Sequence, residues 1–117
     1  MLVAAHNVIS NGIAWEINTA YYASRSLSVA GQTLVPVAMA FSSDGTKAYV
    51  MDNASDRILQ YTLSTAWDIS TGSYASKSLS VTAQDSNPVA MAFSSDGTKA
   101  YVVGTTNDTI YQYTLVG

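Results

Sequence analysis

The segment PVAMAFSSDGTKAYV fills residues 36–50 and returns unchanged at residues 88–102, 52 positions later. When residues 14–65 are aligned with residues 66–117, 33 of the 52 positions are identical. An internal repeat with a period of about 20–50 residues is typical of structures built from stacked units. Two copies this similar must fold in the same way. The chain therefore contains two equal structural units, preceded by a non-repeating segment at residues 1–13.

Four β-strands are expected in each copy. The predicted strands of the first copy are residues 22–29, 36–42, 47–52 and 57–63, and those of the second lie 52 positions later. Asp-Gly in the SSDGT connection favours a tight hairpin between two of them. Alternating serine and apolar residues in YASRSLSV are typical of a half-exposed outer strand. No segment has a sustained helical period of apolar residues, so we expect an all-β fold with almost no helix.

The motif FSSDGTKAYV resembles the core of YVTN-type β-propeller repeats, and the resemblance covers residues 14–117. It implies four-stranded antiparallel blades, with repeat 1 at residues 14–65 and repeat 2 at residues 66–117. Each repeat begins with the outer strand and continues with the three inner ones. The expected fold is thus an all-β propeller with two blades per chain. The resemblance says little about activity, because one fold hosts many functions.

Two blades are too few to close a propeller, which needs about four to eight. Their apolar faces would stay bare, and large bare faces imply association. We therefore expect a ring closed by homo-oligomerisation, in which each chain donates its N-terminal outer strand head-to-tail to the next chain. A homotrimer with six blades is favoured, by analogy with two-blade lectins that trimerise, and a homotetramer with eight blades is the alternative. The rival interpretation is that the chain is a piece of a longer propeller.

Charge and composition argue against several classes of partner. Only 11% of the residues are charged, the net charge is -3, and the five cationic side chains are scattered. A nucleic-acid partner is not expected, because a phosphate-binding surface needs a basic patch. No run of about 18 apolar residues is present, so no membrane span is expected. The chain has no cysteine, which excludes disulfides and thiolate metal sites.

No catalytic or metal-binding constellation stands out. His6 is the only histidine and lies in the non-repeating segment, so a Ser-His-Asp triad is not expected. Asp44 and Asp96 occupy tight turns, where carboxylates commonly bond their own backbone. The DNASD segment has oxygen ligands suited to calcium, but the second copy has Gly104 in place of Asp52. We expect no enzyme, no metal and no cofactor.

The loops that differ between the copies mark where a ligand site would lie. The SSDGT turn is identical in both copies, whereas AGQTLV stands against TAQDSN and MDNASDR against VGTTNDT. In a four-stranded meander these variable loops share one end of the blade. Drift in surface loops is the alternative explanation. The candidate ligand-binding residues are Gln32, Thr33, Asp52, Asn53, Asp56, Gln84, Asp85, Asn87, Asn107 and Asp108.

Two tryptophans are repeated, Trp15 in AWEI and Trp67 in AWDI. Each is a candidate for stacking on a sugar ring, or for packing between blades, since aromatic rings bury a large area. The leading functional hypothesis is a non-enzymatic, self-assembling module that serves as a structural or ligand-binding scaffold. A carbohydrate-binding, lectin-like propeller is the main alternative. An enzyme of the propeller lyase or lactonase kind is a third class.

Overall fold

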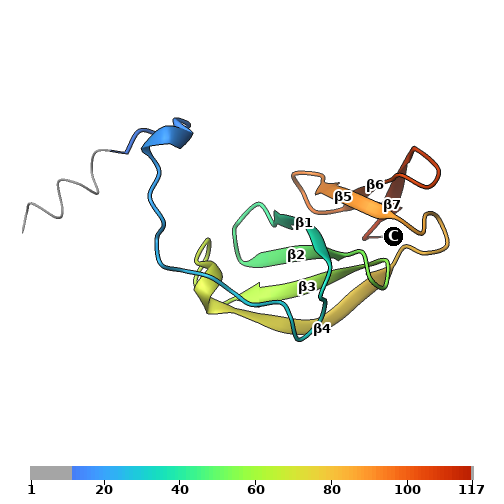
Figure 1. Cartoon of the computed structure of the whole chain (residues 1–117), viewed down its shortest axis with the longest axis horizontal. Coiled ribbons are helices and arrows are strands. Elements are labelled where there is room, and N and C mark those ends of the chain that lie inside the picture. The colour runs from blue at the N-terminus through green and yellow to red at the C-terminus, as the bar shows by residue number, and fades with distance from the viewer. Residues whose placement is uncertain (1–11, 117) are drawn as a thin grey trace, which may run out of the picture.

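A computed structural model describes residues 12–116 as two antiparallel β-sheets (Figure 1). The first sheet contains, in spatial order, β1 (Pro36–Phe41), β2 (Lys47–Asp52), β3 (Arg57–Leu63) and β4 (Gly72–Ser80). The second sheet contains β5 (Pro88–Phe93), β6 (Lys99–Gly104) and β7 (Thr109–Thr114). The all-β prediction is therefore confirmed. Neither sheet closes on itself, and closure of a ring stays a prediction.

Helix is limited to two 3₁₀ turns within residues 12–116, η1 (Ile17–Thr19) and η2 (Ile69–Thr71). They lie 52 residues apart, in the two AW(E/D)I segments. In the same range, no helix is long and apolar enough to cross a membrane. Short 3₁₀ turns commonly serve as connectors, and here each precedes a predicted outer strand.

The two copies have the same hairpin register. Pro36 pairs with Asp52, and Pro88 pairs with Gly104, with a register shift directly after each proline. Gly45 and Gly97, in the hairpin turns, both have φ of +73°. This left-handed conformation is one that glycine adopts without steric cost. The repeated sequence thus produces the same hairpin twice.

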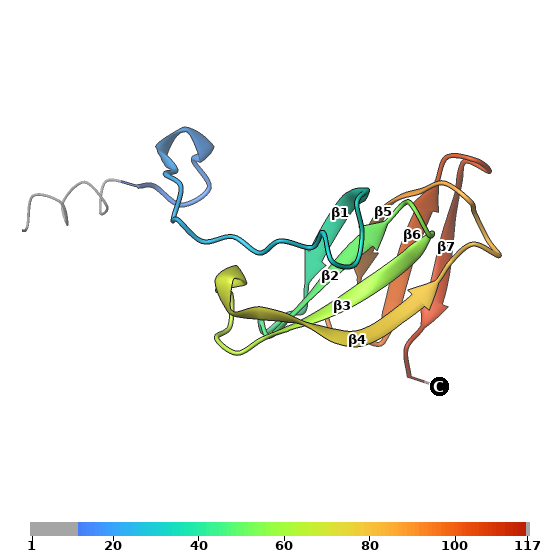
Figure 2. The same cartoon turned by 60° about the horizontal axis from the view of Figure 1, so that its bottom comes forward.

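The two sheets pack face to face, with β1 beside β5 (Figure 2). The core between them contains Met51 and Ile58 from the first sheet and Val102 from the second. Val81, just after β4, completes this cluster and is fully buried. The alternation of side chains along each strand places one face of the first sheet against the second sheet.

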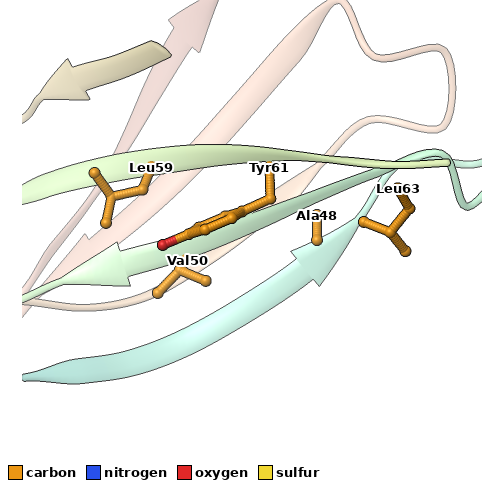
Figure 3. Close-up of a cluster of buried hydrophobic side chains, with 5 residues drawn as sticks. All are labelled: Ala48, Val50, Leu59, Tyr61 and Leu63. Atoms are coloured by element: carbon orange, nitrogen blue, oxygen red, sulfur yellow. The ribbon is translucent and has the colours of Figure 1, made fainter. Parts of the chain in front are cut away.

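The opposite face of the first sheet carries a second buried cluster (Figure 3). It consists of Ala48, Val50, Leu59, Tyr61 and Leu63, all from β2 and β3. Half-buried side chains pack against it from the N-terminal segment (residues 12–35, before β1) and from around η2. They include Leu27, Val29, Ile69 and Tyr74. The N-terminal segment therefore contributes to the core, although it belongs to neither sheet.

The predicted outer strands behave differently in the two copies. Residues 74–81 fall largely in β4, which pairs with β3 from Arg57↔Ser80 to Leu63↔Gly72. Residues 22–29 belong to no strand and have no sheet partner, and they lead toward η1, away from the sheets (Figure 1). The physical reason is that β4 already occupies the edge of β3. A strand needs a neighbour to complete its backbone hydrogen bonds, and no described strand of this chain pairs with residues 22–29.

Candidate functional site

The polar loops meet at one end of the sheets. Backbone hydrogen bonds join them: Asn53 donates to Val35 at 3.0 Å, and Val81 donates to the carbonyl of Asp56 at 2.8 Å. Across the copies, the Asn53 amide donates to Asn87 Oδ1 at 2.8 Å. All ten candidate ligand-binding residues lie in these loops or at the strand ends beside them. The topology therefore brings the predicted residues to one end, where many of them bond to one another.

Asp52 lies buried at the centre of the loops of the first copy. Its Oδ1 accepts from Thr33 Oγ1 at 2.6 Å and from the Ala54 N–H at 3.0 Å, while Oδ2 accepts from Arg57 Nε at 2.9 Å. Burial alone would raise the pKa of Asp52, but hydrogen bonds from Thr33 and Arg57 outweigh it and hold this pKa below its usual value. Asp52 thus acts as an ionised acceptor that holds the loops together.

The second copy places its buried carboxylate from another segment. Asp85 Oδ1 accepts from the N–H groups of Asn87 at 2.8 Å and Thr106 at 3.3 Å, and Oδ2 accepts from the Asn107 N–H at 3.0 Å. A β-carbon at Gly104 would overlap the Asp85 carboxyl group. Gly104 therefore makes room for the carboxylate that position 85 supplies.

The two loop sets are related by an exchange of one acid. The first copy has Thr33 with Asp52, and the second has Asp85 with Gly104, at equivalent positions. In each copy the buried carboxylate accepts from the same two N–H groups of the loop after the second inner strand. Two of the differences between these loops thus form a compensated change that keeps one buried carboxylate per copy. The sequence signal was an aspartate lost at one position and gained at another.

Gln32 and Gln84 form another matched pair. The Tyr61 hydroxyl donates to Gln32 Oε1 at 2.9 Å, and the Tyr113 hydroxyl donates to Gln84 Oε1 at 2.6 Å. Asn107 donates to the Gln84 carbonyl at 2.9 Å. These side chains hold loop to strand in both copies, which is a structural role.

Asp56 and Asp108 complete the candidate set. They have φ of 55° and 50°, a left-handed conformation that aspartate tolerates better than most residues. Within residues 12–116, no group of three or more His, Cys, Asp or Glu side chains is arranged to hold a metal ion. His6 lies outside the described residues.

The opposite end of the sheets contains a hollow of about 510 Å³ between the two SSDGT turns. Trp67 lines it and packs over Gly45, with its ring centroid 5.3 Å from that of Phe41. The backbone N–H of Trp67 donates to the Gly45 carbonyl at 2.9 Å. Trp67 therefore anchors the chain to the turn of its own sheet, yet 60% of it stays exposed, whereas Trp15 is 101% exposed.

Asp44 and Asp96 stabilise the two SSDGT turns. Hydrogen bonds from the side chain and backbone of Thr46, joined by Ser42, lower the pKa of Asp44 to about 2. The backbone of Thr98 and then the side chain of Ser94 do the same for Asp96, whose pKa is also about 2. The predicted structural role of these aspartates agrees with their contacts.

The N-terminal segment has the same local structure as its counterpart in the second copy. Thr19 Oγ1 accepts from the Ile13 N–H at 2.8 Å and donates to the Glu16 carbonyl at 2.8 Å. Thr71 Oγ1 makes the matching bonds to Thr65, at 3.1 Å, and Asp68, at 2.7 Å. Residues 13–20 therefore fold as residues 65–72 do, although they contact no sheet turn.

The edge of β7 is open along the part of the chain that the structure describes. The equivalent strand β3 pairs with β4, but β7 has β6 alone as a neighbour. Exposed strand edges are ready to pair with another strand. The structure thus contains, in one chain, a strand edge without a partner and an extended segment without a sheet.

No family model matches this chain, and no curated protein matches it in sequence. Among solved structures, it is similar to a protein of Bacteroides uniformis ATCC 8492 named "putative 6-phosphogluconolactonase". The TM-score is 0.55 at 20% sequence identity, and the match covers 83% of this chain and 28% of the other. The likeness concerns the fold, and this chain spans less than a third of the protein it matches.

Proposed function

We propose that this chain is a self-assembling β-propeller module that forms a non-enzymatic scaffold. Each chain supplies one complete four-stranded blade, a three-stranded blade, and an outer strand for a second copy. The observation that carries the proposal is that one chain has both an open β7 edge and a segment, residues 22–29, that repeats most of the β4 sequence but belongs to no sheet. The fold similarity to part of a longer chain, with a TM-score of 0.55, is consistent with a unit that belongs to a larger assembly.

The backbone of the N-terminal segment is already suited to this role. Ser24 and Ser76 have φ of 59° and 58°. In the second copy, the β3–β4 register shifts between the pairs Tyr74↔Tyr61 and Lys77↔Gln60, and Ser76 lies in this interval. A positive φ at a serine outside any sheet is uncommon. Residues 22–29 thus have the irregularity that pairing with a β3-like strand requires.

The position of the segment supports the proposal as well. Val29 packs on the cluster that contains Val50, and Val81 packs on the cluster that contains Val102. The two contacts are equivalent, because Val81 lies 52 residues after Val29 and Val102 lies 52 residues after Val50. Val29 therefore lies against the first sheet as the end of β4 lies against the second. A β7 strand of a second copy would take the place beside it.

The contrast in burial shows which surfaces lack a neighbour. Ile58 is 6% exposed and its counterpart Ile110 is 71% exposed, and Leu63 is 3% exposed against 47% for Leu115. Ile58 and Leu63 lie in β3, and their counterparts 52 residues later lie in β7 and directly after it. Burying each apolar side chain contributes about 1.5–3 kcal/mol. Contact between copies would bury on β7 what β3 buries within the chain.

The test is the mass of the chain in solution. Each chain supplies two blades, so three chains give six blades and four give eight. Light scattering should yield about three times the chain mass of 12.4 kDa, or four times in the larger ring. Removal of residues 1–34 should lower the mass to that of one chain, because it removes the donated strand. A full-length chain that is monomeric at all concentrations contradicts the proposal.

Carbohydrate binding is a second candidate, favoured by the hollow beside Trp67. An indole that is 60% exposed lines this hollow together with Ser42 and Ser95, and such rings stack on apolar faces of ligands. The test is a glycan array probed with the full-length chain. Retention on a defined glycan would support the role, and absence of binding to every glycan would remove it.

Lactone hydrolysis is a third candidate, and its basis is the name of the structural neighbour. Identity of 20% carries the fold and not the chemistry, so the assay must be direct. The chain is incubated with 6-phosphogluconolactone and acid release is followed. A rate above the spontaneous one would favour an enzyme over a scaffold, and an unchanged rate would remove this candidate.

A further inference from the structure

We propose that Trp15 of one copy binds over Gly97 of a second copy and anchors the donated strand. The inference rests on the proposed assembly and specifies its contacts. The SSDGT turn of the second sheet then holds a tryptophan between chains, as the turn of the first sheet holds Trp67 within its chain. Trp15 thereby becomes an intermolecular anchor instead of a sugar-stacking residue.

The contact within the chain shows what the turn accepts. The Trp67 ring lies so close to Gly45 that a β-carbon there would overlap it. The backbone N–H of Trp67 donates to the Gly45 carbonyl at 2.9 Å, and the indole ring packs on Phe41. Glycine in the turn therefore has two roles, since it adopts φ of +73° and leaves room for the indole.

The second turn has the same form but an open surface. Gly97 also has φ of +73°, and no heavy atom of residues 12–116 other than its chain neighbours lies within 4 Å of its β-carbon position. Ser94 Oγ donates to Asp96 Oδ1 at 2.8 Å, and the Thr98 N–H donates to the same oxygen at 3.0 Å. The bonds in the first turn are 2.9 and 3.0 Å. The two turns therefore offer the same binding surface.

Trp15 has the geometry to bind there. Its φ is 66°, against 65° for Trp67, a value that is uncommon for a bulky residue. The adjoining 3₁₀ turns are equivalent, with their hydroxyl bonds at Thr19 and Thr71. The backbone around Trp15 therefore has the same conformation as the backbone around Trp67, which packs over Gly45, while the Trp15 side chain is exposed to solvent.

Charge complementarity identifies a second copy as the occupant. Arg25 of the N-terminal segment pairs with Asp68 beside η2, at 3.6 Å. The equivalent positions are Lys77 and Glu16, so the charges are conserved in sign. When Glu16 and Trp15 of one copy bind there together, Glu16 lies next to Lys77 of the second copy, which also supplies Gly97. The pair is exposed, so it favours register more than affinity.

An aromatic pair makes the same argument along the strand. Tyr74 of β4 pairs with Tyr61 of β3, with ring centroids 5.5 Å apart. The equivalent residues are Tyr22 and Tyr113, and Tyr22 is exposed. A donated strand in this register brings Tyr22 of one copy onto Tyr113 of the next. Trp15, Glu16 and Tyr22 then all have partners fixed by the 52-residue repeat.

Cysteine cross-linking tests the contact directly, since the chain has no cysteine of its own. The double variant Trp15→Cys/Gly97→Cys should form disulfides between chains, seen as a ladder up to the full ring on a non-reducing gel. Trp15→Cys/Gly45→Cys is the matched control, because Trp67 already covers Gly45. Trp67→Cys/Gly45→Cys should form a disulfide within one chain and shows that the geometry permits the bond.

The outcomes separate this inference from the proposed assembly. Light scattering of the unmodified chain reports the assembly alone. An oligomer whose Trp15→Cys/Gly97→Cys variant gives no more cross-linking than the Gly45 control would overturn the Trp15 contact and leave the assembly intact. A monomer without cross-links would overturn both.

Alanine variants give a second readout that needs no disulfide. Trp15→Ala should weaken association about 10- to 100-fold, because buried tryptophans dominate interfaces. It should leave the circular dichroism of the single chain unchanged, since Trp15 touches no sheet. Trp67→Ala should lower the stability of the single chain as well. Unchanged association in Trp15→Ala would contradict the inference.

Discussion

At the scale of single residues, the most instructive feature is the exchange of one aspartate between the copies. The first copy holds its carboxylate at Asp52 and the second at Asp85, and both satisfy N–H groups of the same loop. Buried polar groups need such partners, because an unpaired donor costs free energy. Positions 33, 52, 85 and 104 must therefore be considered as pairs.

A double-mutant cycle checks this pairing. Asp85→Thr alone removes an acceptor from three N–H groups, and Gly104→Asp alone crowds two carboxylates together. We expect each single change to lower the Tm by roughly 5 °C or more. The double variant recreates the arrangement of the first copy and should recover at least half of the loss. Additive losses in thermal melts would contradict the coupling.

The turn aspartates give a pH prediction. Asp44 and Asp96 have a pKa of about 2 in the folded chain, against 3.8 without these contacts. A lowered carboxyl pKa contributes stability that is complete above the unfolded value and is lost as the pH falls through the folded value. The Tm should therefore decline between about pH 4 and pH 2.

The control is the variant Asp44→Asn/Asp96→Asn, measured over the same pH range. It should melt lower than the native chain at pH 7, and its Tm should change less between pH 4 and pH 2. Melting curves that fall in parallel for the two proteins would assign the acid sensitivity to other carboxyl groups, such as Asp52 and Asp85, whose pKa values are also lowered.

At the scale of elements, one sequence has two fates. YASKSLSV lies largely in β4, beside β3, whereas YASRSLSV is extended and unpaired. Their composition is almost identical, so propensity does not explain the difference. The availability of a neighbouring edge does, because strand formation depends on hydrogen bonds and cross-strand contacts.

A permuted chain checks this explanation. Residues 14–29 are moved from the N-terminus to follow Gly117, where they stand in the same relation to β7 as residues 66–81 do to β3. The moved segment should form the fourth strand of the second sheet within one chain. Hydrogen exchange is the measurement: the outward-facing amides of β7 should be protected at every concentration in the permuted chain.

The native chain is the control for that measurement. Its β7 amides should be protected at concentrations where the chain assembles and should exchange faster on dilution, because their partner strand comes from another copy. Unprotected β7 amides in both chains at every concentration would show that residues 14–29 do not pair with β7.

At the scale of the whole molecule, two stacked sheets leave surfaces that need covering. The Ile110 side of the second sheet is open, and a hollow of about 440 Å³ lies on the outer face of the first, beside Leu27 and Val29. Because the two copies are equivalent, the open Ile110 face of the second sheet corresponds to the Ile58 face of the first sheet, which packs against the second sheet. Such head-to-tail contacts form a ring when the rotation closes and a filament when it does not.

The repeat also explains how much was predictable. Positions of β1 to β7, the hairpin turns and the near absence of helix follow from local patterns that occur twice in the chain. The polar residues around Asp52 and Asp85 were also identified, as differences between the copies. Their joint role as loop acceptors was not, because hydrogen bonds between segments about 20 residues apart leave no local periodic signal.

By itself, the sequence determined the strands, their order and the equivalence of the two copies, because alternation and turn chemistry act over a few residues. Only the tertiary structure decided that β4 is paired whereas residues 22–29 are not, and that Trp67 packs on a hairpin turn whereas Trp15 does not. Those outcomes depend on a free strand edge and an open turn surface. Both are properties of the packed sheets, and identical segments such as the two SSDGT turns cannot differ in them until the chain has folded.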